Sequence, residues 1–142
     1  MIDNRTAPYA ALLLRITLGT MFVAHALLKL FVFTLPGTAQ FFQSLGFPAS
    51  LAYVTFAAEL VGGVLLLLGI GTRWVAAVLI PFLLGALSVH AGNGWVFSAP
   101  NGGWEYPLFL TAASAVQVLL GDGAFALGSR FSRTASAHLQ TA

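Results

Sequence analysis

Residues 12–31, LLLRITLGTMFVAHALLKLF, form an apolar run long enough to cross a lipid bilayer, and this run limits the folds open to the chain. A helix needs about 20 apolar residues to span the hydrocarbon core. The rest of the sequence agrees, because only 7% of its 142 residues are charged, whereas a soluble domain carries about a quarter. The sequence therefore predicts an integral membrane protein.

Helix-length apolar segments recur along the chain and are separated by short stretches rich in Gly, Pro and Trp. The link GIGTR is a tight turn, and AGNGWVFSAPNGGW has the composition of a loop. The link TLPGTAQFFQSLGFP mixes polar and aromatic residues, which favours a short amphipathic segment along the headgroup layer. We expect an all-α fold, a single-domain four-helix bundle over residues 1–142, with spans at roughly 10–33, 49–70, 73–91 and 105–121.

The positive charges predict the orientation of the bundle. Four spans place both termini and the turn near residue 71 on one side, and the opposite loops, within 30–58 and 74–104, contain no Lys or Arg. The positive-inside rule then places both termini in the cytoplasm. The arginines on that side are Arg5, Arg73, Arg130 and Arg133, and Arg15 lies nearest to them.

Several classes of function are excluded by composition. The chain has no cysteine, which excludes a disulfide, a thiolate metal site and a redox dithiol within it. The pI near 9.5 comes from a surplus of two positive charges without a Lys/Arg cluster, so we expect no nucleic-acid partner. No metal site is expected. A bis-imidazole haem on His25 and His90 would need both ligands at a similar depth in the membrane, and the depths of these two residues differ by roughly 10 Å in the predicted spans.

The first span contains AHA at 24–26, which resembles a signal-peptide cleavage site. Arg15 would interrupt the apolar region of such a signal, and LLKLFVF continues the span beyond the cut. We therefore favour a retained transmembrane helix over a cleaved leader.

Ionisable side chains inside a span are costly and usually mark function. Lys29 lies about 6 Å from the outer end of its helix, but its side chain tilts inward, which favours an internal anionic partner. Glu59 lies roughly 15 Å from either end of the second span and tilts outward, toward Lys29. The sequence therefore predicts a Lys29–Glu59 pair as the functional centre.

Two further cations of the first span allow two interpretations each. His25 shares a helix face with Lys29; it either relays protons with Glu59 or satisfies a backbone carbonyl. Arg15 lies about 8 Å from the inner end and can reach the headgroups, so it either anchors the helix or belongs to a buried polar site.

Small and polar residues complete the candidate set. Gly19 lies on the same stripe as Arg15 and Lys29, and Gly63, next to Gly62, lies one turn beyond Glu59; small residues admit close helix packing or a flat ligand. Glu105 complements the dipole at the start of the fourth helix. Ser114 and Gln117 are expected to make interhelical hydrogen bonds.

These segments together resemble the DoxX family. The segments are LLLRITLGTMFVAHALLKLF, FFQSLGFP, AELVGGVLLLLGIGTRWVA and NGGWEYPLFL, in that order over nearly the whole chain, whereas GDGAFALGSRF departs from the family pattern after its glycines. The resemblance implies a small four-helix protein of a bacterial-type inner membrane, similar to a subunit of a thiosulfate:quinone oxidoreductase, with relatives that associate with oxidative-stress and thiol-handling proteins. The recurrent family positions are Arg15, Gly19, Lys29, Glu59, Gly63 and Glu105.

We derive three hypotheses for function. The first is a quinone-linked oxidoreductase subunit that depends on a redox partner protein: Glu59, Lys29 and His25 would form the reactive site, and Arg15, Gly19, Gly63 and Glu105 would help to bind the quinone. The second is a membrane scaffold in which the buried pair fixes helix register. The third, a small transporter, is disfavoured because no repeated half-helices are present. Association with further copies of the chain stays open.

Overall fold

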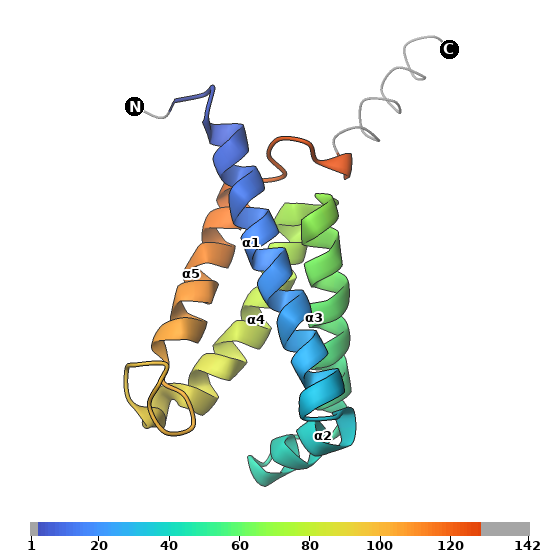
Figure 1. The fold of residues 1–142 in the computed structure, drawn as a ribbon, viewed down its shortest axis with the longest axis vertical. Coiled ribbons are helices and arrows are strands. Elements are labelled where there is room, and N and C mark those ends of the chain that lie inside the picture. Colours follow the sequence, from blue (N-terminus) through green and yellow to red (C-terminus); the bar gives the residue numbers. More distant parts are fainter. Residues whose placement is uncertain (1–2, 129–142) are drawn as a thin grey trace, which may run out of the picture.

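The computed structural model describes residues 3–128, and this part of the chain contains helices and loops but no β-strand (Figure 1). The predicted all-α class is confirmed. The elements are α1 (Ala7–Leu27), the π-helical turn η1 (Leu28–Val32), α2 (Leu35–Ser44), α3 (Ser50–Leu68), α4 (Thr72–His90), the 3₁₀ turn η2 (Ala91–Asn93) and α5 (Glu105–Leu120).

Three helical segments of the described chain are long and apolar enough to cross a membrane. They are Ala7–Val32, Ser50–Leu68 and Thr72–Asn93. The fourth predicted span coincides with α5, a shorter apolar helix of 16 residues. The link in which we expected an amphipathic segment folds as α2.

Local sequence explains where these helices begin and end. Pro8 lies in the first turn of α1, where its missing N–H is not needed. α3 ends at Gly69, which has φ +70°, a left-handed conformation that costs glycine little. Thr34 precedes α2, and its hydroxyl accepts a hydrogen bond from the Gly37 N–H at 3.2 Å, so the side chain caps this helix.

The helices associate as two closely packed pairs, α1 with α3 and α4 with α5 (Figure 1). The start of α1, the α3–α4 turn and the end of α5 lie together, and we call this the terminal end. α2 and the loop of residues 94–104 lie at the opposite end, which we call the loop end (Figure 1). Between the ends, a buried apolar core joins α1, α3, α4 and α5 through Leu18, Phe22, Leu66, Ala76, Leu79, Leu83 and Leu110.

Most of the apolar surface of the long helices faces outward. Only 17–33% of the residues in their most apolar stretches are buried within the protein. Large side chains such as Leu13, Val78 and Leu119 are more than 60% exposed. Apolar surface of this extent does not occur on a soluble monomer, and the chain is a membrane protein whose outer face contacts lipid.

Glycines set the distance between α1 and α3. A Cβ at Gly63 would lie 2.9 Å from the Gly19 carbonyl oxygen and from the Val23 nitrogen. A Cβ at Gly19 would lie 2.8 Å from the Gly63 carbonyl oxygen. The two backbones are therefore in direct contact, which is how small residues associate helices in lipid.

Replacement of Gly63 by Ala should separate α1 from α3 and lower the free energy of unfolding by about 1–3 kcal/mol, the usual cost of overpacking. Gly85→Ala is the matched control, because a Cβ at this helical position of α4 meets nothing within 4 Å. Thermal unfolding in detergent measures both variants. Equal melting temperatures for the two would contradict the close contact.

Candidate functional site

Lys29 and Glu59 form an ion pair between the end of the first long helix and the middle of α3. The Lys29 ammonium Nζ donates to both carboxylate oxygens of Glu59, at 2.9 Å to Oε1 and 2.7 Å to Oε2. The contact expected from tilt and depth is thus present. The two side chains are 16% and 12% exposed, so the pair is mostly enclosed by protein but is not sealed from a small molecule.

Lys29 lies in the π-helical turn η1, which the sequence did not predict. The turn closes with a hydrogen bond of 2.9 Å from the Phe33 N–H to the Leu28 carbonyl, five residues back. A π turn adds one residue to the helical repeat and often occurs at functional positions. In this chain it lies at the point where the ammonium meets the carboxylate.

His25 lies one helical turn before Lys29 and contacts its own backbone. Its Nδ1 is 2.8 Å from the Met21 carbonyl oxygen, a contact that places the proton on Nδ1 and leaves Nε2 as the acceptor of the neutral ring. The structure thus contains the backbone contact that was the alternative to a proton relay. No hydrogen bond joins His25 to Glu59 in the described chain.

The His25 ring also stacks on Tyr106 of α5, with ring centroids 5.8 Å apart and an angle of 22°. The Tyr106 hydroxyl is buried and has no hydrogen-bond partner among residues 3–128. Through this contact the cluster of ionisable side chains, Lys29, Glu59 and His25, reaches α5. No residue spacing indicates it, because Tyr106 is 81 positions from His25 and the contact depends on how the two helix pairs meet.

Arg15 lies at the terminal end, where it is enclosed by protein. Its side chain is 2% exposed, and Nη2 donates to the Ala124 carbonyl at 3.0 Å. Nε and Nη1 have no partner in the described residues. The anchor interpretation, in which the guanidinium reaches the headgroups, is therefore wrong. Arg15 and Lys29 are 14 residues apart on one helical segment, about 20 Å, so they belong to different sites.

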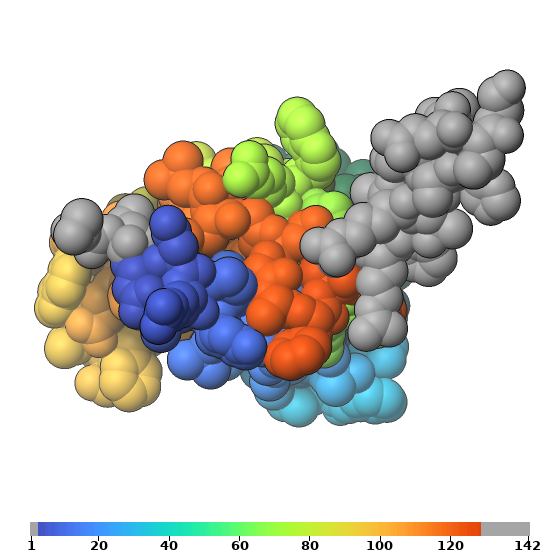
Figure 2. Space-filling view, turned by 90° about the horizontal axis from the view of Figure 1, so that it is seen from above, coloured from blue at the N-terminus to red at the C-terminus, as the bar shows by residue number. Residues whose placement is uncertain are grey.

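Segment 121–128, which was not predicted, folds over the terminal end beside the start of α1 (Figure 2), and its Ala124 carbonyl contacts the buried Arg15. Backbone hydrogen bonds attach it to the rest of the protein, from Ala124 to the Pro8 carbonyl at 2.9 Å and from Gly128 to the Gly69 carbonyl at 3.0 Å. The Asp122 carboxylate accepts from the backbone N–H of Thr72 at 3.0 Å and from its hydroxyl. Asp122 thereby caps the start of α4. Arg130 and Arg133, used to predict orientation, lie outside the described residues.

The remaining candidates do not gather around the ion pair. Gly19 and Gly63 are occupied by the α1–α3 contact, and Gly62 packs on the Leu79 side chain. Glu105 begins α5, as expected, and its Oε1 accepts a hydrogen bond of 2.8 Å from the Phe97 N–H. Of the seven predicted site residues, the structure brings Lys29, Glu59 and His25 together and places the others elsewhere.

The predicted interhelical hydrogen bonds of Ser114 and Gln117 are wrong. Gln117 donates to the Gly121 carbonyl at 2.6 Å, at the end of its own helix. The buried Ser114 hydroxyl has no partner within residues 3–128. Both side chains are completely buried. Within residues 3–128, no polar group of a neighbouring helix forms a hydrogen bond with either of them.

Gly69 is the position where α3 meets Arg15. A Cβ there would overlap Nη1 of the guanidinium. We expect Gly69→Ala to lower the melting temperature more than Gly71→Ala does. The free energy of unfolding should differ between the two variants by about 1–3 kcal/mol, the usual cost of overpacking. Gly71 is a matched control, since it also has positive φ, +58°, but a Cβ would meet nothing within 4 Å. Both variants carry the strain of a left-handed alanine, so their difference, measured by thermal unfolding in detergent, reports the contacts of Gly69 with Arg15 and with the Ala126 backbone, whose Cα would lie 2.8 Å from the new Cβ; no difference would contradict this close packing.

Comparison with known proteins gives two matches. The family model described as DoxX matches residues 10–91. A protein of Bacillus subtilis (strain 168), described as "Putative oxidoreductase CatD", is 42% identical over 112 residues, which are 77% of this chain and 78% of the relative. No solved structure shows a significant match.

Proposed function

The chain belongs to the DoxX family of membrane proteins, and from this premise we propose that it is a quinone-linked membrane subunit of an oxidoreductase system. The observation that carries the proposal is the Lys29–Glu59 pair with His25 one turn away, because an ionisable group enclosed among apolar helices marks a functional site by default. The name of the Bacillus relative supports a redox role. Without cysteine in this chain, we assign the supply of electrons to a partner protein.

The residues of the pair fit a quinone headgroup. Lys29 uses its ammonium for two hydrogen bonds to Glu59 and has three donors, so one N–H is left for a ring carbonyl. His25 Nδ1 is engaged by Met21, so Nε2 of the neutral ring is an acceptor and can receive a hydrogen bond from the O–H of the reduced quinol. A quinone, when bound, supplies two-electron, two-proton redox chemistry.

Within this proposal each side chain has a separate task. Lys29 orients the ligand and compensates the charge of Glu59, which lowers the cost of a carboxylate away from water. Glu59 takes up and releases a proton at its carboxylate oxygens. The Tyr106 ring, which stacks on His25, holds the imidazole beside the Lys29–Glu59 pair and restricts the access of water to that pair.

We further propose that all four long helices, α5 included, cross a bacterial inner membrane as one domain and one four-helix bundle. α5 has 16 residues and is about 24 Å long, so its loops would lie within the membrane interface. Both termini would be cytoplasmic, because Arg5 and Arg73 lie at the terminal end and the loop end contains no Arg.

A membrane scaffold is the second candidate. The same pair supports it, because the ammonium contacts both carboxylate oxygens of Glu59 and thereby links α1 to α3. A buried pair with this geometry can fix helix register without binding a ligand. The two candidates differ in what the pair does when a quinone is offered.

Quinone binding to the full chain in lipid nanodiscs separates the two candidates. We expect a short-chain ubiquinone or menaquinone to quench Trp fluorescence saturably, and Glu59→Gln and Lys29→Ala each to weaken binding at least tenfold. Asp3→Asn, which removes an exposed carboxylate at the terminal end, should leave the affinity unchanged.

The double variant K29E/E59K tests the scaffold directly. It retains an ion pair but moves the ammonium to α3, so it should regain stability without regaining quinone affinity. If stability and affinity return together, or if the wild type binds no quinone while both single variants only lose stability, the pair is structural and the quinone proposal is wrong.

A further inference from the structure

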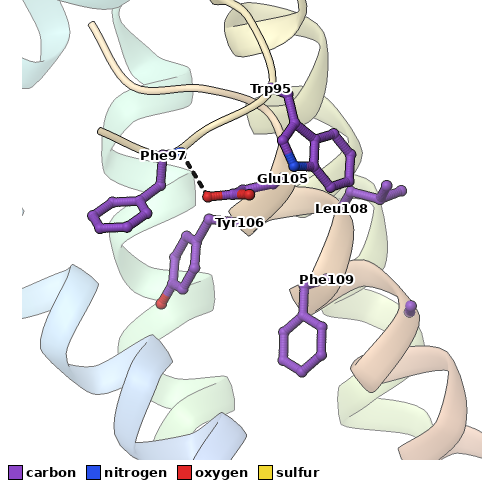
Figure 3. A pocket seen from close by; sticks show the side chains of 7 residues that line it. Trp95, Phe97, Glu105, Tyr106, Leu108 and Phe109 are labelled. Atoms are coloured by element: carbon purple, nitrogen blue, oxygen red, sulfur yellow. Dashed lines mark hydrogen bonds between the residues drawn. The ribbon is translucent and has the colours of Figure 1, made fainter. Parts of the chain in front are cut away.

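An open cleft of about 500 Å³ lies at the loop end, between α5 and the loop of residues 94–104 (Figure 3). Its walls are aromatic: Trp95 and Phe97 come from the loop, and Tyr106 and Phe109 come from α5. Trp95, Phe97 and Phe109 are 52%, 68% and 69% exposed. The cleft is of ligand-binding size and presents ring surfaces to the membrane around the protein.

One carboxylate, that of Glu105, lies among these rings (Figure 3). Its Oε1 accepts the Phe97 N–H, and no cationic side chain of the described residues pairs with it, because Lys29 is engaged by Glu59. The start of α5 contributes the equivalent of about half a positive charge. The helix dipole therefore offsets part of the negative charge of an ionised Glu105, and no cationic side chain of residues 3–128 offsets the rest.

The loop that forms the cleft is held in place by its own contacts. Trp95 and Trp104 pack edge to face with centroids 4.5 Å apart, and the Glu105 N–H donates to the Trp95 carbonyl at 3.0 Å. His90 and Asn93 contact the Gly102 carbonyl at 3.0 Å and 2.9 Å. A cleft built in this way is formed before a ligand arrives, which reduces the entropic cost of binding.

The lining changes from polar to apolar with depth. Glu105 lies at the first residue of α5, and Leu108, Phe109 and Ala112 follow one to two turns further along the helix. This distance corresponds to about 5–10 Å. Along α5 the cleft thus passes from an anionic, aromatic end to an apolar end, and it offers a headgroup and an acyl chain separate surfaces.

We propose that this cleft binds a membrane lipid whose headgroup ends in an ammonium, such as phosphatidylethanolamine. A cation over aromatic faces gains cation–π attraction, and an ethanolamine N–H can donate to Glu105. An aromatic belt at the membrane interface accounts for Trp and Tyr near a helix end, but it does not account for a carboxylate among these rings that pairs with no cationic side chain of residues 3–128. The site contains neither Lys29 nor Glu59, although Tyr106 borders both the cleft and His25, and its test involves no quinone.

Lipid titration of the delipidated full chain in dodecyl maltoside tests the proposal. Phosphatidylethanolamine and phosphatidylglycerol with identical acyl chains are compared by thermal shift and by native mass spectrometry of bound lipid. We expect the ethanolamine lipid to bind at least fivefold more tightly. Glu105→Gln should abolish this preference, because the amide oxygen still accepts the Phe97 N–H but carries no charge.

Phe109→Ala is the second variant, and it should weaken ethanolamine-lipid binding at least threefold while leaving the loop contacts intact. Phe125→Ala, at the terminal end, removes a ring with the same exposure of 69%, and Asp3→Asn removes a distant carboxylate; neither should change the affinity. The assignment of an ammonium lipid would be overturned if the wild type bound the two lipids equally or if Glu105→Gln kept the preference. It would also be overturned if free ethanolamine competed for the cleft as well as the whole lipid does.

Discussion

The contact between α1 and α3 is the interaction on which the rest of the structure depends. It is made at three levels: Arg15 against Gly69 at the terminal end, Gly19 against Gly63 in the middle, and Lys29 with Glu59 toward the loop end. The glycine contact brings the backbones together, and the two charged side chains then find partners across a short gap. In lipid, where apolar burial between helices contributes little, close packing and internal polar contacts hold helices together.

The two ends of the molecule are built differently. At the terminal end, segment 121–128 covers a buried guanidinium and caps α4 through Asp122, so polar groups there are enclosed by protein. At the loop end, the aromatic cleft around Glu105 is open, and this carboxylate pairs with no cationic side chain of residues 3–128. A closed, internally bonded end favours a structural role, whereas an open end with an unneutralised charge favours contact with a ligand.

The same ion pair supports a redox site and a scaffold because the two roles need the same physical property. A carboxylate away from water is stable only beside a cation or a donor, and that cation also attracts a polar ligand. What distinguishes the roles is access and spare donor capacity. Lys29 and Glu59 are 16% and 12% exposed, and the ammonium has one donor beyond its two contacts with Glu59, which is why we rank the quinone site first.

The sequence by itself determined the all-α class, the membrane environment, the helix ranges and the pairing of Lys29 with Glu59. These follow from length, apolar periodicity and the tilt of side chains along a helix, which are local properties. Only the tertiary structure decided that Arg15 is enclosed under segment 121–128, that His25 stacks on Tyr106, and that Glu105 lies in an aromatic cleft. It also decided that, within residues 3–128, Ser114 and Gln117 have no hydrogen-bond partner on another helix. These depend on how loops fold back and how the two helix pairs meet, and such long-range geometry leaves no periodic signal in the residues that take part in it.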